Sequence, residues 1–525
     1  MDYASAFRTL PYRFLPRCMP RTFSSRLGAW LCLLLLIFAF NVLVNKFFWG
    51  SSTDQLYTLD KKDQLVKDLQ RSDSDKTKPR ARKDDAFYEY FHPPVEICAT
   101  VISYGAFMVE FKRLLINTTN IEGKIGGEDY RSVMFQSEES EYVKLSSDTF
   151  AVECSVLHNI DNLVQFPRSH FPEFLGATQR AKFSASITKS FGKTPLVKAV
   201  FLVKRFEYVN LHHCTTEWYN TYLGVRRLGL RPQDVHVLLI DAHPAAILDN
   251  VWAALFGGFS RIGEYRSSVF TQKPTMLPSI PDPEGDPKKP RSRLILADRA
   301  VWSPPGYHSP MTRLRTPYIH LIEEFRDHFL TSHGLEVTPV VPLAAGENPS
   351  HSRCRPRLVV ILRRNYVSHP RQRTVGRKFA NEQEILYHLQ NATVSLPSGE
   401  MVPLLDSVVG VQLDLLSMQE QLKFTGNADI LLGVHGAGMT HAMYMPHQSA
   451  VVELFPMASA GKNFDFEAIA RWKDHVYVPW RKSTPETELT EEALRIPPFV
   501  LLELVTEAIS KFQRKFIHCT YQSEG

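Results

Sequence analysis

The chain has few cysteines and lacks the common metal-binding and nucleic-acid-binding patterns. Seven cysteines stand in 525 residues, and none of them forms a CxxC pair or another spacing typical of metal ligands. There is no HExxH sequence, no DxD in a loop after an expected strand, no RNA-binding signature and no internal repeat. The net charge of +6 is modest for this length and does not favour nucleic acid as a partner. We therefore expect neither a metal site nor a cofactor.

The composition is that of a globular protein, with 44% hydrophobic and 22% charged residues. The N-terminal region differs from the rest. Five arginines precede an apolar run from Leu27 to Val44 that only Asn41 interrupts, which predicts a membrane anchor over 27–49 and a cytoplasmic tail over 1–26. A cleaved signal peptide is the alternative, but the basic segment is long and no A-x-A site follows it. We expect a type II protein of the Golgi membrane with its bulk in the lumen.

The segment 50–86 is polar and rich in charge, so we interpret it as a stem that buries no core. Sequons at Asn117 and Asn391 are glycosylation sites if the chain is lumenal. Five cysteines follow the anchor, an odd number that leaves at least one without an intramolecular partner. Their pairing is not predictable from the spacing.

Two regions of alternating strands and helices follow. In the first, over 87–340, an apolar strand after Pro195 leads into a helical pattern over Glu207–Leu223, then a buried strand over Asp234–Asp241 and an amphipathic helix over Ile247–Phe256. A shorter strand is expected at 294–297 and a helix at 318–328. The break over 338–355 contains Pro, Gly and Ser and separates this region from the next.

The second region, over 355–495, repeats the pattern. Strands are expected at 357–363, 404–411, 430–432 and 450–455, with helices at 382–389, capped by Asn381, and at 417–426. Ser417 and Glu420 have the spacing of a capping box. A last amphipathic helix, 499–512, belongs to a C-terminal segment over 496–525. The order predicts the α/β class, with two Rossmann-like domains facing a cleft.

The stretch GVHGAGMTH, which begins at Gly433, holds the strongest candidate site. It stands between two expected strands, and its glycines permit a tight turn and close approach to a ligand. We expect a helix from Thr440, whose N-terminus would favour a phosphate. A structural turn is the alternative, although the imidazoles of His435 and His441 favour a ligand. Glu453, in the next strand, is a candidate for holding ribose hydroxyls.

A basic loop, RRNYVSHPR, begins at Arg363 directly after an expected strand. Guanidinium groups match phosphate oxygens, so Arg363 and Arg364 are candidates for binding a diphosphate, although a basic surface loop is as plausible for the motif alone.

In the first region, we look for a general base among side chains near expected strand ends. The candidates are His213, Glu217, Asp241 and His243, each of which has a structural alternative as a hydrogen-bonded or helix-capping residue.

The sequence GVHGAGMTH followed by VVELFP resembles the GxHGAGLTH signature of the family 61 glycosyltransferases. The segments HVLLIDAHPAAILDNVWAALF and LRRNYVSHPR are similar to the xylose-transferring branch of that family. The resemblance spans about 200–474. Two positions depart from the pattern: Asn365 stands where an acidic residue is expected, and Met439 replaces a leucine.

The resemblance implies a GT-B fold and an inverting transfer from a UDP-sugar in the Golgi or ER lumen without an essential metal. In this branch the donor is UDP-xylose and the acceptor is O2 of the core β-mannose of an N-glycan. The residues that it implies for donor binding are Arg363, Arg364, His435, Gly436, Ala437, Gly438, Thr440, His441 and Glu453. The alternatives are transfer of GlcNAc from UDP-GlcNAc to protein hydroxyls, a catalytically silent UDP-sugar-binding protein, and a nucleotide-sugar hydrolase.

Overall fold

A computed structural model describes residues 93–516 except 105–107, 120, 155–170, 190–196, 267–269, 272–274, 277–290, 293, 304–305, 307–308, 338–354, 365–374, 397, 457–462, 482–487 and 491–492. The predicted tail, anchor and stem lie outside these residues. Among the helices in the described part, none is both long enough and apolar enough to cross a membrane.

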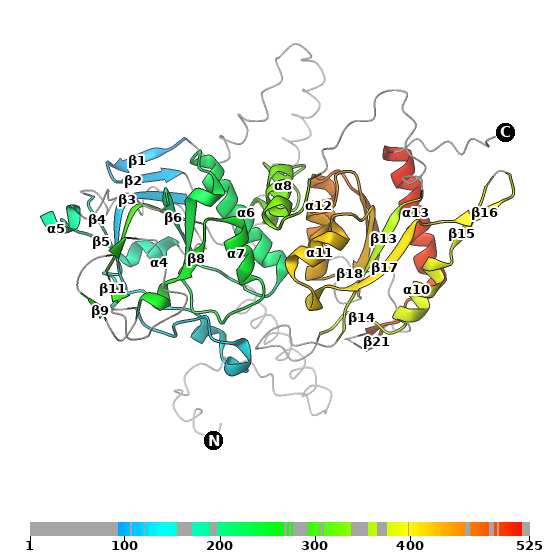
Figure 1. Ribbon diagram of the computed structural model, residues 1–525, viewed down its shortest axis with the longest axis horizontal. Coiled ribbons are helices and arrows are strands. Elements are labelled where there is room, and N and C mark those ends of the chain that lie inside the picture. The colour runs from blue at the N-terminus through cyan, green and yellow to red at the C-terminus, as the bar shows by residue number, and fades with distance from the viewer. Residues whose placement is uncertain are drawn as a thin grey trace, which may run out of the picture. The chain divides into compact units, whose positions relative to one another are not determined.

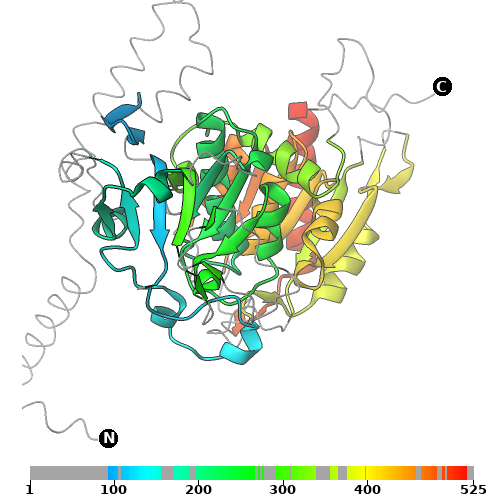
Figure 2. The same cartoon turned by 60° about the vertical axis from the view of Figure 1, so that its left-hand side comes forward.

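The first sheet has a parallel part and an antiparallel part. Strands β12 (Leu294–Trp302), β6 (Ala199–Val203), β7 (Val235–Leu239) and β8 (Phe259–Arg261) run parallel and lie side by side in Figure 2, where they are green. On the other edge of β12, the antiparallel strands β3 (Met108–Asn117), β2 (Val101–Tyr104) and β1 (Val95–Cys98) follow. The short strands attached to this sheet are β4 (Phe150–Val152), β5 (Thr178–Arg180) and β10 (Thr275–Met276).

The predicted helices of this region are present with shifted ends. They are α6 (Leu211–Arg227), α7 (Asp249–Leu255) and α8 (Ile322–Ser332), and Asn210 caps α6 by accepting from the backbone N–H groups of its first turn. The remaining short elements are α4 (Phe171–Gly176), α5 (Ala185–Thr188), the pair β9 (Phe270–Thr271) and β11 (Arg291–Ser292), and the 3-10 helices η3 (Tyr130–Val133), η4 (Glu138–Glu141), η6 (Pro232–Asp234), η7 (Ile262–Tyr265) and η9 (Pro310–Thr312). Cys98 and Cys154 form a disulfide, and Cys214 is free and buried.

The second sheet is entirely parallel. Its order is β17 (Ser407–Gln412), β13 (Arg357–Leu362), β18 (Ile430–Val434), β19 (Ala450–Leu454) and β20 (Val476–Trp480). The middle strands are buried on both faces and read as continuous apolar runs, as expected for a parallel sheet covered on two sides. This sheet confirms the α/β class.

Helices cover both faces of the second sheet. Figure 1 shows α10 (Glu382–Gln390) and α13 (Pro498–Phe516) on one side, and α11 (Met418–Thr425) and α12 (Asp465–Trp472) on the other. The capping box of Ser417 and Glu420 is confirmed. Smaller elements are η10 (Leu413–Leu415), η11 (Ala437–Met443), the hairpin β15 (Thr393–Ser395) and β16 (Met401–Pro403), and the sheet of β14 (Lys378–Phe379), β22 (Ala493–Leu494) and β21 (Glu488–Thr490).

Hydrophobic packing joins the two regions. One cluster of buried residues runs from α6, α7 and α8 to α11, η11 and α12. Tyr444, directly after η11, stacks on Phe329 of α8 with ring centroids 4.1 Å apart, and its hydroxyl lies 2.9 Å from Thr215 Oγ1 of α6. The loop after β18 therefore contacts the first region.

Three local predictions were wrong. The strand that was expected to stop at Gly433 continues to Val434, because Gly433 and Val434 remain paired with Glu453 and Leu454 of β19. The helix expected from Thr440 is the 3-10 helix η11, which begins at Ala437. Asn381 stands at the N-cap of α10 but makes no capping bond, since its side chain is hydrogen-bonded to the backbone of Ile496.

Candidate active site

The order of the second sheet defines where a ligand should bind. Numbered in chain order, the strands lie in the order 2-1-3-4-5. The second strand, β17, is therefore on one side of β13, and the later strands β18, β19 and β20 are on the other side. Ligands of such folds bind beyond the carboxyl ends of the two strands at this switch point, which here are β13 and β18. Arg363 is the first residue after β13 and His435 the first after β18. Both predicted loops thus meet at one edge of the sheet.

Two guanidinium groups converge on the backbone of this loop. Gly436 has φ +156°, and a Cβ on it would lie 2.7 Å from Arg363 Nη1 and 3.5 Å from Arg377 Nη1. Arg377 Nη1 donates to the carbonyl oxygen of His435 at 3.1 Å. Burial lowers the pKa of Arg377, and the positive charge of Arg363 lowers it further. Two cations this close favour binding of an anion between them.

Arg377 was missed by the sequence analysis. Arg377 belongs to no recognisable sequence motif. Its backbone has φ 64°, a value that few non-glycine residues adopt. Such backbone strain is characteristic of functional sites. Among the described residues no carboxylate forms an ion pair with Arg363.

Arg364 lies apart from this pair of cations. It is exposed, and its guanidinium binds the carboxylate of Glu382, with Nε–Oε1 at 3.0 Å and Nη2–Oε1 at 2.5 Å. A diphosphate would have to replace that carboxylate, so the geometry favours Arg377 as the partner of Arg363. Asn365 lies outside the described residues.

The rest of the glycine-rich loop is partly enclosed. Ala437 and Gly438 are partly exposed, whereas Thr440 and His441 are fully buried. His441 Nδ1 lies 2.9 Å from the carbonyl oxygen of Gly438, and burial lowers its pKa to about 4. Because η11 is a short 3-10 helix, we expect the guanidinium groups to contribute more than a helix dipole to anion binding.

His435 and Glu453 form a buried pair. His435 Nδ1 lies 2.6 Å from Glu453 Oε1, and the hydroxyl of Tyr477 donates to Glu453 Oε2, also at 2.6 Å. His435 Nε2 lies 3.0 Å from the side-chain nitrogen of Asn463. Glu453 is 1% exposed, so it does not face a position that a ribose can occupy in this structure.

The first region reaches this site through α6. Phe466 of α12 contacts both His435 and His212, with ring centroids 5.4 Å and 5.7 Å away. His212 Nε2 lies 3.8 Å from Asp465 Oδ1, and burial lowers the pKa of His212 to about 4. His213 is partly buried beside it, and burial also lowers its pKa against the effect of Glu207. Of the four predicted bases, His213 therefore lies on the part of α6 that faces the second region.

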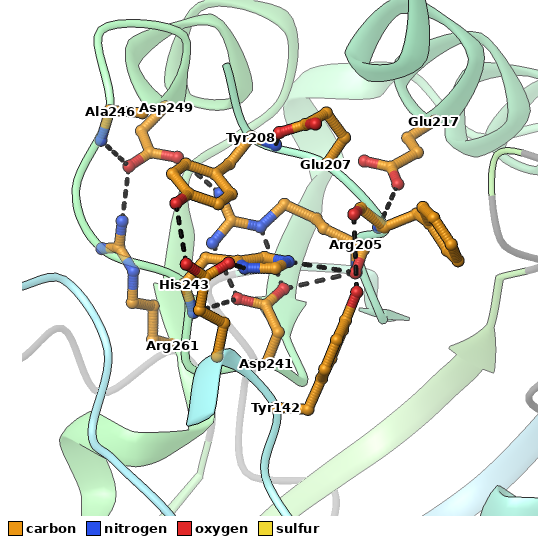
Figure 3. A network of polar contacts seen from close by, with 12 residues as sticks. Tyr142, Arg205, Glu207, Tyr208, Glu217, Asp241, His243, Ala246, Asp249 and Arg261 are labelled. Carbon is orange, nitrogen blue, oxygen red and sulfur yellow. Dashed lines mark hydrogen bonds and ion pairs between the residues drawn. The ribbon is translucent and has the colours of Figure 1, made fainter. Parts of the chain in front are cut away.

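The other three predicted bases are enclosed in the first region. Glu217 accepts a hydrogen bond from the backbone N–H of Phe206, and burial raises its pKa well above the usual range. Figure 3 shows the network beside it, in which Asp241 binds Arg205 through two bonds of 2.7 Å and 2.9 Å. Burial raises the pKa of Asp241, but the charge of Arg205 outweighs this effect and holds it well below the usual range.

The same network encloses His243. Its Nδ1 lies 3.2 Å from Glu141 Oε2 and its Nε2 lies 3.2 Å from the carbonyl oxygen of Arg205, while its ring stacks on Tyr208. Asp241 and His243 are both 0% exposed. Their geometry suits positioning of the loops after β6 and β7, and a role as base stays a prediction.

The two sequons differ in exposure. Asn391 ends α10 at the surface and its side-chain nitrogen donates to the carbonyl oxygen of Tyr387. Asn117 ends β3 and is partly buried, and Thr118 between it and Thr119 is 1% exposed. Asn391 is thus the more accessible acceptor. Within the described residues, no group of three or more His, Cys, Asp or Glu side chains is arranged to hold a metal ion.

Comparison with known proteins gives a consistent family. The pattern of the Glycosyltransferase 61 family matches residues 104–452, which run from the end of β2 in the first sheet into β19 in the second. The chain is 29% identical over 280 residues to the β-1,2-xylosyltransferase of Arabidopsis thaliana, covering 53% of this chain and 50% of that protein. It is 24% identical over 279 residues to β-1,2-xylosyltransferase RCN11 of Oryza sativa subsp. japonica, covering 53% and 48%.

A shorter match involves a different activity. The chain is 31% identical over 162 residues to the EGF domain-specific O-linked N-acetylglucosamine transferase of Gallus gallus, covering 31% of this chain and 24% of that protein. The chain thus spans about half the length of the xylosyltransferases it matches and about a quarter of this transferase.

Proposed function

We propose, from the premise that this chain belongs to the glycosyltransferase 61 family and is a glycosyltransferase, that it transfers xylose from UDP-xylose to O2 of the core β-mannose of N-glycans. The transfer inverts the anomeric centre, and it requires no metal. The two α/β regions act as the acceptor and donor domains of a GT-B enzyme.

The observation that carries the proposal is the convergence of Arg363 and Arg377 on Gly436 at the switch point of the second sheet. A UDP-sugar has a diphosphate that carries the charge of the leaving group. Two guanidinium groups and a glycine without a side chain provide the charge and the space that this diphosphate needs. The same charges stabilise UDP as it departs, which is why no divalent ion is required.

Xylose is preferred to GlcNAc as the transferred sugar because of the extent of similarity. The match to the xylosyltransferases extends over 280 residues, against 162 for the GlcNAc transferase, although the identity over the shorter stretch is slightly higher. Transfer of GlcNAc to protein hydroxyls is therefore the second candidate. A silent UDP-binding protein is disfavoured because Arg363, His435 and Glu453 are all present in the geometry described above.

The secretory pathway is the proposed location. The basic and apolar N-terminus supports a type II anchor, with the catalytic part in the Golgi lumen. The disulfide between Cys98 and Cys154 favours an oxidising compartment, and the exposed sequon at Asn391 is usable there. Lumenal topology is tested by digestion with an N-glycosidase: loss of mass from the wild type, but not from Asn391→Gln, supports it.

The transfer itself is tested with the purified full chain. It is incubated with UDP-xylose or UDP-GlcNAc, with and without an N-glycopeptide that carries the core mannose, in the presence of EDTA. Addition of a pentose to the glycan, read by mass spectrometry, supports the proposal and its independence of metal together. Transfer only from UDP-GlcNAc to a polypeptide acceptor identifies the second candidate. Binding of UDP without transfer from either donor refutes the proposed activity.

A further inference from the structure

Glu453 is held by two residues of the protein and has no free oxygen. It stands in β19 between β18 and β20, in register with Gly433 on one side and Pro479 on the other. Oε1 accepts from His435 Nδ1 at 2.6 Å and Oε2 accepts from the hydroxyl of Tyr477 at 2.6 Å. With both oxygens bonded and 1% exposure, this carboxylate is suited to act on His435.

These contacts determine which nitrogen of His435 carries the proton in the neutral ring. An ionised carboxylate only accepts hydrogen bonds, so Nδ1 must donate to Glu453. Nε2 of the neutral ring is then an acceptor, in agreement with the Asn463 side-chain nitrogen 3.0 Å away. A carboxylate or carbonyl that fixes the tautomer through one nitrogen leaves the other available to take a proton.

We propose that His435 is the general base of the transfer and that Glu453 and Tyr477 are positioning residues that keep its Nε2 as the proton acceptor. This inference rests on the proposed function. The acceptor hydroxyl takes the position from which Asn463 now donates, and its proton passes to Nε2. The hydroxyl oxygen forms the bond to the anomeric carbon, the bond from that carbon to UDP breaks, and its electron pair leaves with the phosphate. The imidazolium then releases its proton to water.

The surroundings of His435 agree with this role. Its carbonyl oxygen accepts from Arg377 and its neighbour Gly436 faces Arg363, which places the imidazole next to the proposed diphosphate site. Phe455 stacks on the ring at 5.2 Å and limits its rotation. The predicted bases Glu217, Asp241 and His243 are enclosed in the first region, and none of their side chains reaches this site as His435 does.

The titratable and charged groups that face His435 or its immediate partners are Glu453, Tyr477, His212, Asp465, Arg363, Arg377 and Arg481.

The tautomer can be measured without any assay of activity. In the full chain labelled with 15N-histidine, long-range proton–nitrogen spectra at neutral pH should show His435 protonated at Nδ1. The signal is assigned by its absence from His435→Gln. Glu453→Gln should shift this signal, because the charged acceptor at Nδ1 is lost. A neutral His435 protonated at Nε2 in the wild type overturns the proposal.

Kinetics separates a positioning role from ribose binding. Glu453→Gln should reduce kcat by about 100-fold, within the usual range for general-base catalysis, while UDP affinity measured by calorimetry changes less than about twofold. Tyr477→Phe should also reduce kcat at nearly unchanged UDP affinity, but by a smaller factor.

The matched controls are Glu503→Gln and Tyr387→Phe, which change exposed residues of α13 and α10 and should leave turnover as in the wild type.

Two outcomes distinguish the possible failures. Weakened UDP binding with normal turnover in Glu453→Gln means that Glu453 binds ribose, which overturns this proposal and leaves the proposed function standing. A wild type that binds UDP but transfers no sugar refutes the proposed function, and the base role with it.

The His435→Ala variant tests the base directly. Its kcat should fall by about 100-fold or more, and added imidazole should restore part of it. Normal turnover in His435→Ala, together with a complete loss in His213→Ala, assigns the base to α6 and overturns the proposal.

Discussion

Gly436→Ala tests whether the convergence of the two arginines forms the donor site. Gly436 has φ +156°, and the new methyl group would lie 2.7 Å from Arg363 Nη1, closer than carbon and nitrogen approach without repulsion. The atom in the way is the end of a flexible side chain, so we expect Arg363 to move rather than the sheet to deform. The phosphate site then loses one guanidinium.

The magnitude follows from that lost contact. A hydrogen bond to a charged group contributes about 1.5–3 kcal/mol, so UDP affinity should fall by about 10- to 150-fold. A residue held in a sparsely populated backbone region costs about 1–3 kcal/mol, so the free energy of unfolding should also fall. The effect on binding has to be separated from this effect on stability.

Gly399→Ala is the matched control. Gly399, with φ +85° between β15 and β16, has no atom within 4 Å of the position that the added methyl group would take, so the substitution changes backbone strain without touching the site. UDP affinity is measured by calorimetry and stability by denaturant unfolding, for both variants. We expect Gly399→Ala to bind UDP as the wild type does. If Gly436→Ala also binds UDP as the wild type does, Arg363 does not hold the phosphates and the assigned donor site is wrong.

Three further predictions follow from the same contacts. Arg363→Ala should weaken UDP binding by about 10-fold or more, whereas Arg364→Ala should leave it nearly unchanged in calorimetry; the reverse order would show that the loop rearranges around the donor. Asp241→Asn should lower the free energy of unfolding by about 1–3 kcal/mol because the buried guanidinium of Arg205 loses one of its two carboxylate partners and keeps Asp249, while a loss of kcat at unchanged stability would instead support Asp241 as the base. Burial raises the pKa of Glu323, but His447 and Lys473 outweigh it and lower the value to about 2, so its contribution to stability is present above pH 4.5 and lost as the pH falls toward 2. Unfolding of Glu323→Gln should therefore differ from the wild type at neutral pH and converge with it in acid, and a constant difference would contradict the ion pair.

Much of the second sheet was predictable from local sequence. The apolar runs of β13, β18 and β19 are continuous because these strands are buried on both faces, and the capping box at Ser417 is a contact between neighbours in the chain. The loops after β13 and β18 were identified because glycines, histidines and arginines directly follow those runs. Strand β20 alternates as VYVPW and could have been found by its period, although Pro479 weakens that pattern.

The roles of individual side chains depended on contacts over long distances in the sequence. Arg377 donates to His435, 58 residues away, and nothing around Arg377 marks it as part of a site. Glu453 was a ribose candidate until β20 placed the Tyr477 hydroxyl against its second oxygen. Asp241 stands at a strand end, as many catalytic acids do, yet Arg205 from the neighbouring strand end neutralises and encloses it.

The sequence by itself determined the α/β class, most strands and helices, and the family through its glycine–histidine loop. These features depend on the periodicity of apolar residues and on short motifs, both of which are local. Only the tertiary structure decided the strand order 2-1-3-4-5, the approach of Arg377 rather than Arg364 to Arg363, and the contact between Glu453 and His435. The physical reason is that pKa, hydrogen bonding and access depend on which groups lie within a few ångströms, and these neighbours come from strands that only folding brings together.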